Sequence, residues 1–455
     1  MSKQSTKPPS GTRDFLPRDI ARRRHVIGVI ERVYASYGFV PIETPSYENL
    51  STLLGKYGEE GDQLLFRLLK RRDALARVLT AGDPQEADLA DLGLRYDLTV
   101  PLARVVAQYR DLPRFFKRYQ IQPVWRADRP GRGRFREFYQ CDVDMIGSES
   151  LIAESEVLAA VCQVVENLGF DDFTVQVNHR QLLRSMILAA GIALDAEQSA
   201  LVALDKLDKV GAEGVLAELA ERGIAPDAAQ TLLELSRPAE ADGPPLAALD
   251  RLADQLNDDD GQQAIRDLRE LNTLCQATVA GRYLRFSPQL ARGLSYYTGP
   301  IFELNVAQLA GSIGGGGRYD NLVGMFSNQP IPAVGCSLGL ERLLLLMDER
   351  DLYPELQISA QVIVCNAGAQ AEDLLLIAQT LRQAGLRVEV YPNPQVKLGK
   401  QLQYADSAAV GIPIAAIVGK DELASGQLTL KNLASGEQQT LPLSEAATQV
   451  SVWLS

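Results

Sequence analysis

The sequence has few of the residues that build metal centres and disulfide frameworks. It contains two histidines, His25 and His179, and neither lies in an HExxH pattern, which argues against a histidine-based metal site or a Ser-His-Asp triad. Its five cysteines are scattered without a CxxC pair, which argues against a disulfide framework or a cysteine-rich zinc site. We therefore expect reduced, mostly buried cysteines and no metal held by protein ligands alone.

Long hydrophobic runs are also absent. No apolar run approaches the roughly 18–20 residues needed to span a bilayer, and the N-terminal stretch MSKQSTKPPSGTRDF lacks the apolar core of a secretory signal. With 46% hydrophobic and 23% charged residues, the composition is that of a soluble globular protein. The sequence therefore predicts a cytoplasmic protein without a membrane partner.

Basic residues are outnumbered by acidic ones over the whole chain, with 46 Lys and Arg against 58 Asp and Glu. The formal net charge of −12 argues against a nucleic-acid partner at first sight. Binding of phosphates needs only one local basic face, however, and the stretches RFFKRYQ (114–120) and RPGRGRFR (129–136) are strongly basic. Solvated surface charge is the alternative interpretation of each stretch.

A chain of 455 residues is too long for one ordinary core. Apolar residues at helical spacing predict helices over 20–39 and 150–170, and alternating residues predict an antiparallel hairpin around a basic loop at 129–134. Residues 185–282 are rich in Ala, Leu, Glu and Asp, which indicates an inserted helical module. The last hundred or so residues alternate strand and helix signals, which predicts a small α/β domain with a largely parallel sheet.

The stretch VWRADRPGRGRFREFYQCDVDMIG (124–147) concentrates charged groups around the predicted hairpin. Gln140, Asp142 and Asp144 follow a period of two and share one face of a strand. Guanidinium groups paired with carboxylates suit a phosphate-bearing substrate that also has an amine end. A salt-bridged surface hairpin is the alternative. The arginines of the stretch are Arg126, Arg129, Arg132, Arg134 and Arg136.

Three further stretches carry isolated signals. In GSIGGGGRYD (311–320) the glycines permit either close approach of a ligand or a sharp turn, and the residues alone favour neither. ARGLSYYTGPIFEL (291–304) has strand character but contains Arg292 and two adjacent tyrosines. LGLERLLLLMDE (338–349) is typical of a helix, and a charge such as Arg342 usually belongs to its polar face.

These stretches, taken together and in order, resemble the histidyl-tRNA synthetase family of class II aminoacyl-tRNA synthetases, and the resemblance covers nearly the whole chain. The two family-specific histidine motifs are the most discriminating, and they are matched by ARGLSYYTG and GSIGGGGRYDNLVGMF. The remaining matches are SGTRDFLP (10–17) to the N-terminal signature, GFVPIETPSYE (38–48) to motif 1, LRYDLTVP (94–101) to the histidine-site loop, WRADRPGRGRFREFYQCDVDMIG to motif 2 and AVGCSLGLERL (333–343) to motif 3.

The resemblance implies an α+β fold with two functional parts and a homodimeric assembly. Residues 1–184 and 283–350 would form a class II catalytic domain on an antiparallel sheet, and 185–282 would form a helical insertion. A linker at 351–359 would lead to a small α/β anticodon-binding domain at 360–455. The insertion would lie near the tRNA acceptor arm, although its acidic runs are not obvious phosphate binders.

For ATP, the resemblance implies a set of arginines. Arg126 would contact the α-phosphate and the carboxylate region of histidine, and Arg342 would pack on the adenine side and reach the terminal phosphates. Arg292 would lie on the α-phosphate, where related enzymes place a metal, and Arg134 would be a further ATP ligand. Arg292 and Arg126 are therefore the expected catalytic residues.

For the amino acid, the resemblance implies that Asp97, Thr99 and Gln140 bind the α-amino group. Asp144 and Tyr297 would hold the two imidazole nitrogens, because a neutral imidazole offers one donor and one acceptor. A site that hydrogen-bonds both nitrogens rejects analogues that lack them, so no editing domain is expected. The whole expected histidine-binding set is Asp97, Leu98, Thr99, Gln140, Asp144, Tyr296 and Tyr297.

The implied activity is the ATP-dependent attachment of L-histidine to tRNA-His through a histidyl-adenylate, with magnesium carried by ATP as a substrate and no tightly bound cofactor. The main alternative is a catalytically inactive, histidine-sensing paralogue such as the regulatory subunit of ATP phosphoribosyltransferase. Such relatives typically lose the arginines and the anticodon-binding domain, both of which this sequence retains. The two histidine motifs disfavour a related synthetase with another amino-acid specificity.

Two features of the stretch 291–304 depart from the simplest expectation. The family usually has an aspartate where this chain has Ser295, and we expect the change to affect fine positioning more than activity. Arg292 and Tyr297 are an odd number of residues apart, so a regular strand would put them on opposite faces. A bend near Gly293 is required if both residues line one site.

Overall fold

The computed structural model describes residues 5–454 with the exception of 239–243, 245, 292–295, 308, 310, 328 and 357. It divides into two compact units, Met1–Tyr353 and Pro354–Ser455, and the division falls within the segment 351–359.

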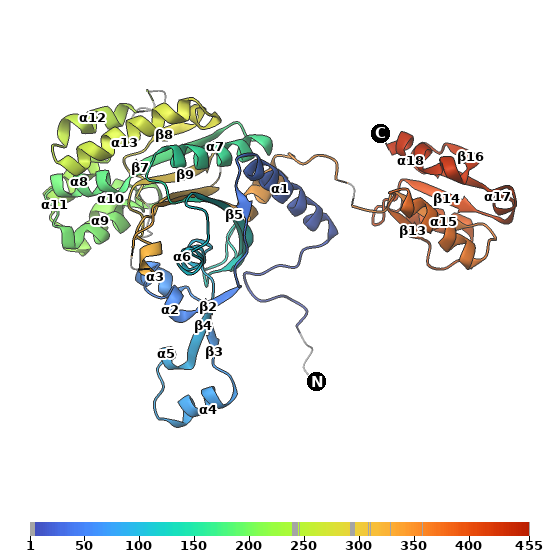
Figure 1. Cartoon of the computed structure of the whole chain (residues 1–455), viewed down its shortest axis with the longest axis horizontal. Coiled ribbons are helices and arrows are strands. Elements are labelled where there is room, and N and C mark those ends of the chain that lie inside the picture. Colours follow the sequence, from blue (N-terminus) through green and yellow to red (C-terminus); the bar gives the residue numbers. More distant parts are fainter. Residues whose placement is uncertain are drawn as a thin grey trace. The chain divides into compact units, whose positions relative to one another are not determined.

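The larger unit is built on a mostly antiparallel sheet (Figure 1). Its strands are β1 (Val40–Pro41), β5 (Phe116–Trp125), β6 (Glu137–Ile146), β7 (Phe173–His179), β8 (Leu284–Phe286), β9 (Pro300–Val306), β10 (Gly314–Arg318) and β11 (Ala333–Gly339). Among the described residues they form an eight-stranded sheet in the order β1-β5-β6-β11-β10-β9-β7-β8. Only the outer pairs, β1 with β5 and β7 with β8, are parallel. The predicted α+β class with an antiparallel sheet is confirmed.

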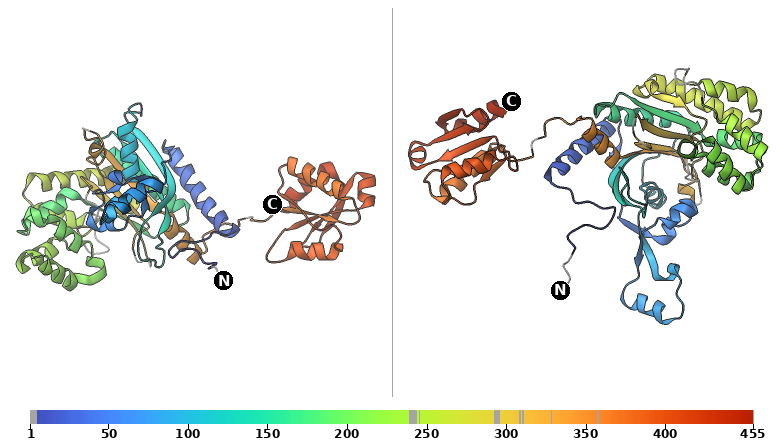
Figure 2. Two further views of the ribbon diagram at one scale, coloured as in Figure 1. Left: turned by 90° about the horizontal axis from the view of Figure 1, so that it is seen from below. Right: turned by 180° about the vertical axis from the view of Figure 1, so that it is seen from behind.

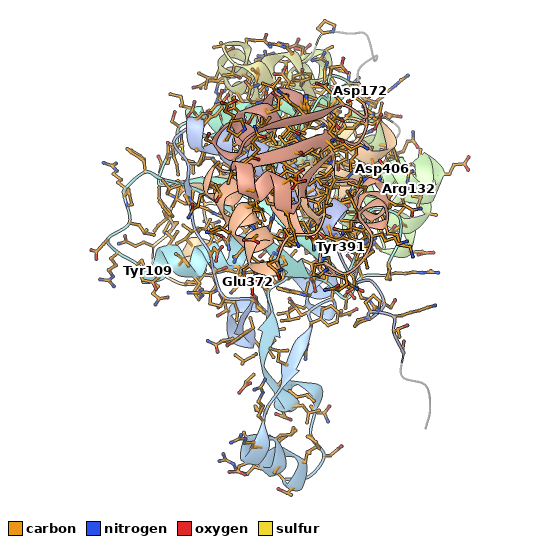
Figure 3. The ribbon with its side chains drawn as sticks, turned by 90° about the vertical axis from the view of Figure 1, so that its right-hand side faces the viewer. Tyr109, Arg132, Asp172, Glu372, Tyr391 and Asp406 are labelled. Carbon is orange, nitrogen blue, oxygen red and sulfur yellow. The ribbon has the colours of Figure 1, made fainter. Side chains whose placement is uncertain are left out.

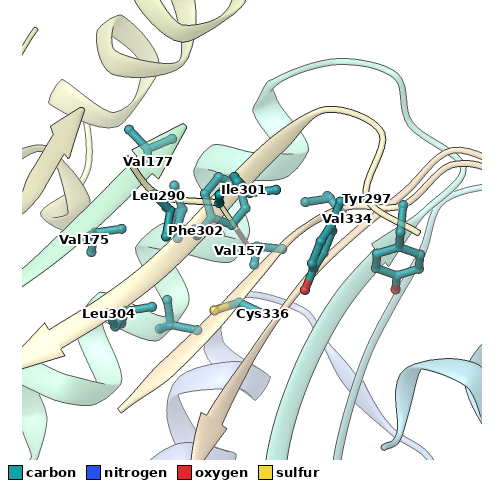
Figure 4. Close-up of a cluster of buried hydrophobic side chains, with 14 of the residues drawn as sticks. Val157, Val175, Val177, Leu290, Tyr297, Ile301, Phe302, Leu304, Val334 and Cys336 are labelled. Atoms are coloured by element: carbon teal, nitrogen blue, oxygen red, sulfur yellow. The ribbon is translucent and has the colours of Figure 1, made fainter. Parts of the chain in front are cut away.

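Two long helices cover one face of this sheet. The helix predicted over 20–39 is α1 (Pro17–Ser36), which has proline at its first position, where no helical hydrogen bond is lost. The helix predicted over 150–170 is α7 (Ile152–Asn167), and it ends just before Gly169, whose φ of 91° favours glycine. Figure 4 shows Val157 of α7 beside buried apolar side chains of β7, β9 and β11. The apolar side chains of these strands therefore mark the face of the sheet that α7 covers.

The segment between β7 and β8 is helical and belongs to the same compact unit as the sheet. Here α13 contacts both α7 and β7, so the segment is anchored to the sheet and to the helix that covers it. Its α-helices are α8 (Arg180–Ala189), α9 (Glu197–Leu204), α10 (Leu207–Glu221), α11 (Pro226–Leu235), α12 (Ala247–Gln255) and α13 (Asp259–Gln276).

A narrow arm projects from the larger unit, as Figure 3 shows. Its small sheet has the order β2-β4-β3, and α4 at the tip has no buried residue. The base of the arm is joined to the main sheet because Ala127 N–H donates to Leu64 O over 2.9 Å. The elements here are β2 (Tyr47–Asn49), α2 (Leu50–Leu53), α3 (Gly58–Gln63), β3 (Arg67–Leu69), α4 (Arg72–Thr80), α5 (Glu86–Leu89) and β4 (Ala90–Leu94).

The smaller unit contains a second sheet, in the order β13-β12-β14-β15-β16, with helices on both faces (Figure 2). Alternate residues of β12 bury against α15 on one face and α16 on the other. The sheet is mixed rather than largely parallel, because the short link between β15 and β16 permits a hairpin but no crossover. The elements are β12 (Val362–Asn366), α15 (Ala371–Gln383), β13 (Val388–Val390), α16 (Leu398–Asp406), β14 (Ile414–Val418), α17 (Lys420–Ser425), β15 (Gln427–Asn432), β16 (Gln438–Pro442) and α18 (Ala446–Leu454).

Candidate active site

The face of the main sheet that lies opposite α7 is polar along its centre. In the register of the strands, Asp144 on β6 is opposite Arg118 on β5 and Gly335 on β11, and Gly335 is in turn opposite Gly317 on β10. Side chains alternate between the faces of a strand, so this row shares one face. The next row on the same face contains Gln120, Asp142, Ser337, Gly315 and Glu303.

Asp144 is held from two sides on this polar face. Arg118 Nη2 lies 2.8 Å from Asp144 Oδ2, and the Tyr319 hydroxyl donates a hydrogen bond to Oδ1. Burial raises the pKa of Asp144 above its usual range, although Arg118 and the Tyr319 hydroxyl act in the opposite direction. A Cβ at Gly335 would lie 1.9 Å from Asp144 Oδ1, so only glycine leaves room for the carboxylate.

Asp142 and Gln140 lie beside Asp144 on the same strand face, as the sequence predicted. Gln140 Nε2 donates to Ser337 Oγ over 2.9 Å and to Asp142 Oδ1 over 3.3 Å. Gln140 Oε1 is buried and has no hydrogen-bond partner among the described residues, which leaves an acceptor for a ligand. Burial raises the pKa of Asp142 to about 7. The charge of Arg118 lowers this pKa, and the charge of Asp144 raises it.

Asp97 precedes helix α6 (Thr99–Gln108), and its position is fixed by the start of that helix. Asp97 Oδ1 accepts hydrogen bonds from Val100 N–H and from the Tyr57 hydroxyl, each over 3.1 Å. Burial raises the pKa of Asp97, while these bonds and the nearby Arg126 lower it. Leu98 is completely buried, and Thr99 is partly buried in the first turn.

Arg126 follows directly after β5, and its guanidinium is held on an aromatic surface. Arg126 Nε donates to Tyr96 O over 3.1 Å, and the guanidinium carbon lies 4.2 Å from the centre of the Tyr96 ring. The predicted hairpin is present, since β5 and β6 pair antiparallel around a loop with a Gly131–Arg134 bridge. In this loop Arg134 Nη2 lies 2.7 Å from Asp128 Oδ1.

Arg342 lies in the first turn of helix α14 (Leu340–Glu349) and faces the glycine-rich segment. It donates to Ser312 O, and a Cβ at Gly311 would lie 3.1 Å from Arg342 Nη1. Burial lowers the pKa of Arg342, and the charges of Arg134 and Arg126 lower it further. Arg126 and Arg134 therefore lie near enough to Arg342 to lower its pKa.

Tyr296 and Tyr297 are both buried, and their rings lie 4.9 Å apart. A Cβ at Gly317 would lie 2.9 Å from the Tyr297 ring, so Tyr297 packs over the glycine in the row of Asp144. In Figure 4, Tyr297 lies at the edge of the buried apolar cluster. Arg292, Ser295 and the predicted bend near Gly293 fall outside the described residues.

Sequence reasoning missed two side chains that hold Asp144. Arg118 was part of the basic stretch 114–120, which was interpreted as a surface patch, but its side chain is completely buried. The signal that could have found it is the alternation of Arg118, Gln120 and Gln122 along β5. Tyr319 lies in the glycine-rich stretch 311–320, for which the sequence predicted only a role of the glycines.

Two structural findings concern metals and membranes. The described ranges contain no group of three His, Cys, Asp or Glu side chains placed to hold a metal ion. Within those same residues, no helix combines the length and the apolar character needed to cross a membrane. The cysteines are buried, as predicted.

Comparisons with known proteins place these features in a family. A family model described as histidyl-tRNA synthetase matches residues 11–343, and one described as an anticodon-binding domain matches residues 360–453. A histidine–tRNA ligase of Porphyromonas gingivalis is 43% identical over 97% of this chain and 98% of its own length. One of Gloeobacter violaceus is 41% identical over 96% of each chain.

The fold agrees with these sequence matches. The crystal structure of histidyl-tRNA synthetase from Nostoc sp. PCC 7120 superposes with a TM-score of 0.78 at 32% identity, and the match covers 99% of both chains. With a family model over most of the larger unit, relatives above 40% identity along nearly the full length and a shared fold, this chain belongs to the histidyl-tRNA synthetase family.

Proposed function

We propose that this protein is an ATP-dependent ligase that attaches L-histidine to tRNA-His through a histidyl-adenylate, with release of pyrophosphate and AMP. The observation that carries this proposal is the convergence of buried carboxylates and arginines on one face of the sheet, in a chain that retains both family domains. Relatives named histidine–tRNA ligase match it along nearly the full length.

Histidine binds on the polar face of the sheet in this proposal. Asp97, Thr99 and Gln140 receive the α-amino group, and the unpartnered Oε1 of Gln140 supplies one acceptor. Asp144 and Tyr297 bind the imidazole nitrogens, with Leu98 and Tyr296 as apolar and aromatic walls. Since the imidazole offers one donor and one acceptor, recognition of both nitrogens supplies the specificity.

ATP binds along the arginines in this proposal. Arg126 and Arg292 contact the α-phosphate, whereas Arg134 and Arg342 bind the remainder of the nucleotide. The nearness of Arg126 and Arg134 to Arg342, whose pKa their charges lower, supports a shared polyanionic ligand. Magnesium enters bound to the ATP phosphates, where it offsets negative charge, since the described residues offer no three-ligand metal cluster.

The first reaction step is attack of the histidine carboxylate on the α-phosphorus, with pyrophosphate as the leaving group. Negative charge grows on the α-phosphate and on pyrophosphate, and arginines fixed before the reaction stabilise it. In the second step the adenylate esterifies the terminal ribose of tRNA and AMP leaves. The catalytic residues of the first step are therefore Arg126 and Arg292.

The assignment of domains to residue ranges is part of the same proposal. Residues 1–184 and 283–350 form the catalytic domain, 185–282 a helical insertion and 360–455 the domain that binds the anticodon. We place the enzyme in the cytoplasm as a homodimer. A histidine-sensing paralogue without catalysis is disfavoured, because Arg126 and Arg342 are present on the site and the match extends through the anticodon-binding domain.

The test is ATP–pyrophosphate exchange by the purified protein, followed by charging of a mixed tRNA pool. We expect exchange with histidine alone among the amino acids, labelled histidine on tRNA-His alone, and loss of exchange in Arg292→Ala. A folded protein that binds histidine without supporting exchange would overturn the enzymatic proposal in favour of the sensor.

A further inference from the structure

Two side chains outside the expected histidine-binding set fix the carboxylate of Asp144. Arg118 reaches it from β5, with Nη2 at 2.8 Å from Oδ2, and the Arg118 side chain has no solvent exposure. Tyr319 reaches it from the end of β10 and donates its hydroxyl proton to Oδ1. Oδ2 therefore has an ion pair from β5, and Oδ1 has a hydrogen bond from the residue that follows β10.

These contacts leave Asp144 with acceptor capacity in a restricted direction. An ionised carboxylate has about four acceptor positions, and the Tyr319 hydroxyl uses one of them, whereas Arg118 pairs with Oδ2 by charge without hydrogen-bond geometry. The sheet closes one side, because a Cβ at Gly335 would already lie 1.9 Å from Oδ1. A ring N–H that approaches the polar face of the sheet can use what remains.

Charge selects Asp144 over its neighbour as the ionised acceptor. Arg118 Nη2 lies 2.8 Å from Asp144 Oδ2 but 4.0 Å from Asp142 Oδ2, so this buried cation is nearer to Asp144. Two buried carboxylates on one strand face repel each other when both are ionised. The shorter contact therefore places the negative charge on Asp144.

We propose that Arg118 and Tyr319 are positioning residues that hold Asp144 as an ionised, correctly oriented acceptor for a ring N–H of the amino-acid substrate. Neither residue touches the substrate in this account. They act through Asp144. In this way they set the enzyme's preference for an amino acid whose side-chain ring has an N–H donor over one whose ring has the same size but no N–H. The inference rests on the proposed function, since it assigns the imidazole to Asp144.

The test compares histidine with β-(4-thiazolyl)alanine, in which a ring sulfur replaces one ring nitrogen. Initial rates of ATP–pyrophosphate exchange give kcat/KM for both amino acids in the wild type, Tyr319→Phe, Arg118→Gln and Arg118→Lys. Tyr34→Phe is the matched control, because Tyr34 is equally buried and its hydroxyl donates to Cys141 O over 3.4 Å on the opposite face of β6. Melting temperatures show which variants are folded.

We expect Tyr319→Phe and Arg118→Gln to reduce the preference for histidine by about 10- to 100-fold, mainly through the KM for histidine, with the KM for ATP unchanged. Arg118→Lys keeps the charge and should restore part of the preference. Tyr34→Phe should leave the preference at the wild-type value.

A pH profile adds a readout that a purely structural role would not change. The ionisable groups that face Asp144 among the described residues are Arg118 from β5, Asp142 on its own strand and Tyr319 beyond β10. Loss of the cation in Arg118→Gln raises the pKa of Asp144, so the acidic limb of kcat/KM for histidine should move to higher pH.

Equal losses with both amino acids in Tyr319→Phe would overturn the inference, because they would show general damage rather than lost ring recognition. Should Arg118→Gln not fold, Tyr319→Phe alone decides the question, since it removes one oxygen atom and keeps the ring. Absence of histidine-dependent exchange in the wild type is a different result, which would contradict the proposed function itself.

Discussion

The main sheet buries an arginine with a carboxylate on each of its two faces, and the two sites differ in how completely their polar atoms are paired. On the α7 face, Arg318 binds both oxygens of Glu154 over 2.6 and 2.8 Å, and its remaining nitrogen donates to Ser148 O over 2.9 Å and to the partly exposed Asp320 Oδ1 over 3.1 Å. On the opposite face, Arg118 Nη2 lies 4.0 Å from Asp142 and 2.8 Å from Asp144, but neither Nε nor Nη2 has a hydrogen-bond partner among the described residues.

The difference separates a structural ion pair from a binding site. A fully paired buried cluster fixes two elements against each other and has no remaining capacity for a ligand. A cluster with two buried carboxylates for one cation, and with the unpartnered Gln140 Oε1 beside it, is incompletely paired by itself and can be completed by a substrate. We therefore expect stability to depend mostly on the first face and histidine binding on the second.

The largest effect on stability is expected from Arg318→Met. It leaves Glu154, which has no solvent exposure, without its cation, and the free energy of unfolding in urea should fall by about 3–5 kcal/mol. The double variant Arg318→Met/Glu154→Leu should recover most of that loss, because neither charge remains buried. If Arg318→Met were as stable as the wild type, the Arg318–Glu154 pair would not be a structural ion pair.

Two glycines on neighbouring strands give the next contrast. A Cβ at Gly316 would lie 1.9 Å from the main-chain oxygen of Gly335, whereas a Cβ at Gly335 would lie 1.9 Å from the Asp144 side chain. Gly316→Ala should therefore destabilise the sheet by about 1–3 kcal/mol. Gly335→Ala should raise the KM for histidine by about 10- to 100-fold through displacement of Asp144. Equal KM values for the two folded variants would contradict this assignment of the faces.

A smaller effect is expected from pH at Asp142. Its pKa of about 7 in the folded protein is above the ordinary value of 3.8, so the folded state binds the extra proton between these values. Stability from this group is complete below pH 4 and decreases as the pH rises through about 7. Asp142→Asn should therefore gain about 1–3 kcal/mol relative to the wild type between pH 5 and pH 8. A stability difference that does not change with pH would show that Asp142 is ionised throughout.

The sequence predicted those parts of the site that depend on local patterns. The period of two placed Gln140, Asp142 and Asp144 on one face, because alternation along a strand needs no knowledge of its neighbours. The hairpin of β5 and β6 follows from an equally local signal, whereas the place of Asp97 in the site came from the family resemblance.

What the sequence did not show depends on register between distant strands. Arg118 meets Asp144 only because β5 pairs with β6 in one register, and Tyr319 joins them from more than 170 residues further along the chain. Composition alone cannot distinguish a buried arginine from an exposed one. The basic stretch around Arg118 therefore indicated a surface position, although the side chain is buried. In the smaller unit, strand and helix signals did not reveal that β15 and β16 form a hairpin.

The central claim is that Asp144 on the polar face selects histidine, and Asp144→Asn tests it most directly. The side chain keeps its size but loses the charge that accepts a ring N–H, so kcat/KM for histidine in ATP–pyrophosphate exchange should fall by about 100-fold or more. The KM for ATP and the folded circular-dichroism spectrum should stay at wild-type values. A folded Asp144→Asn variant with wild-type kcat/KM for histidine would contradict the account.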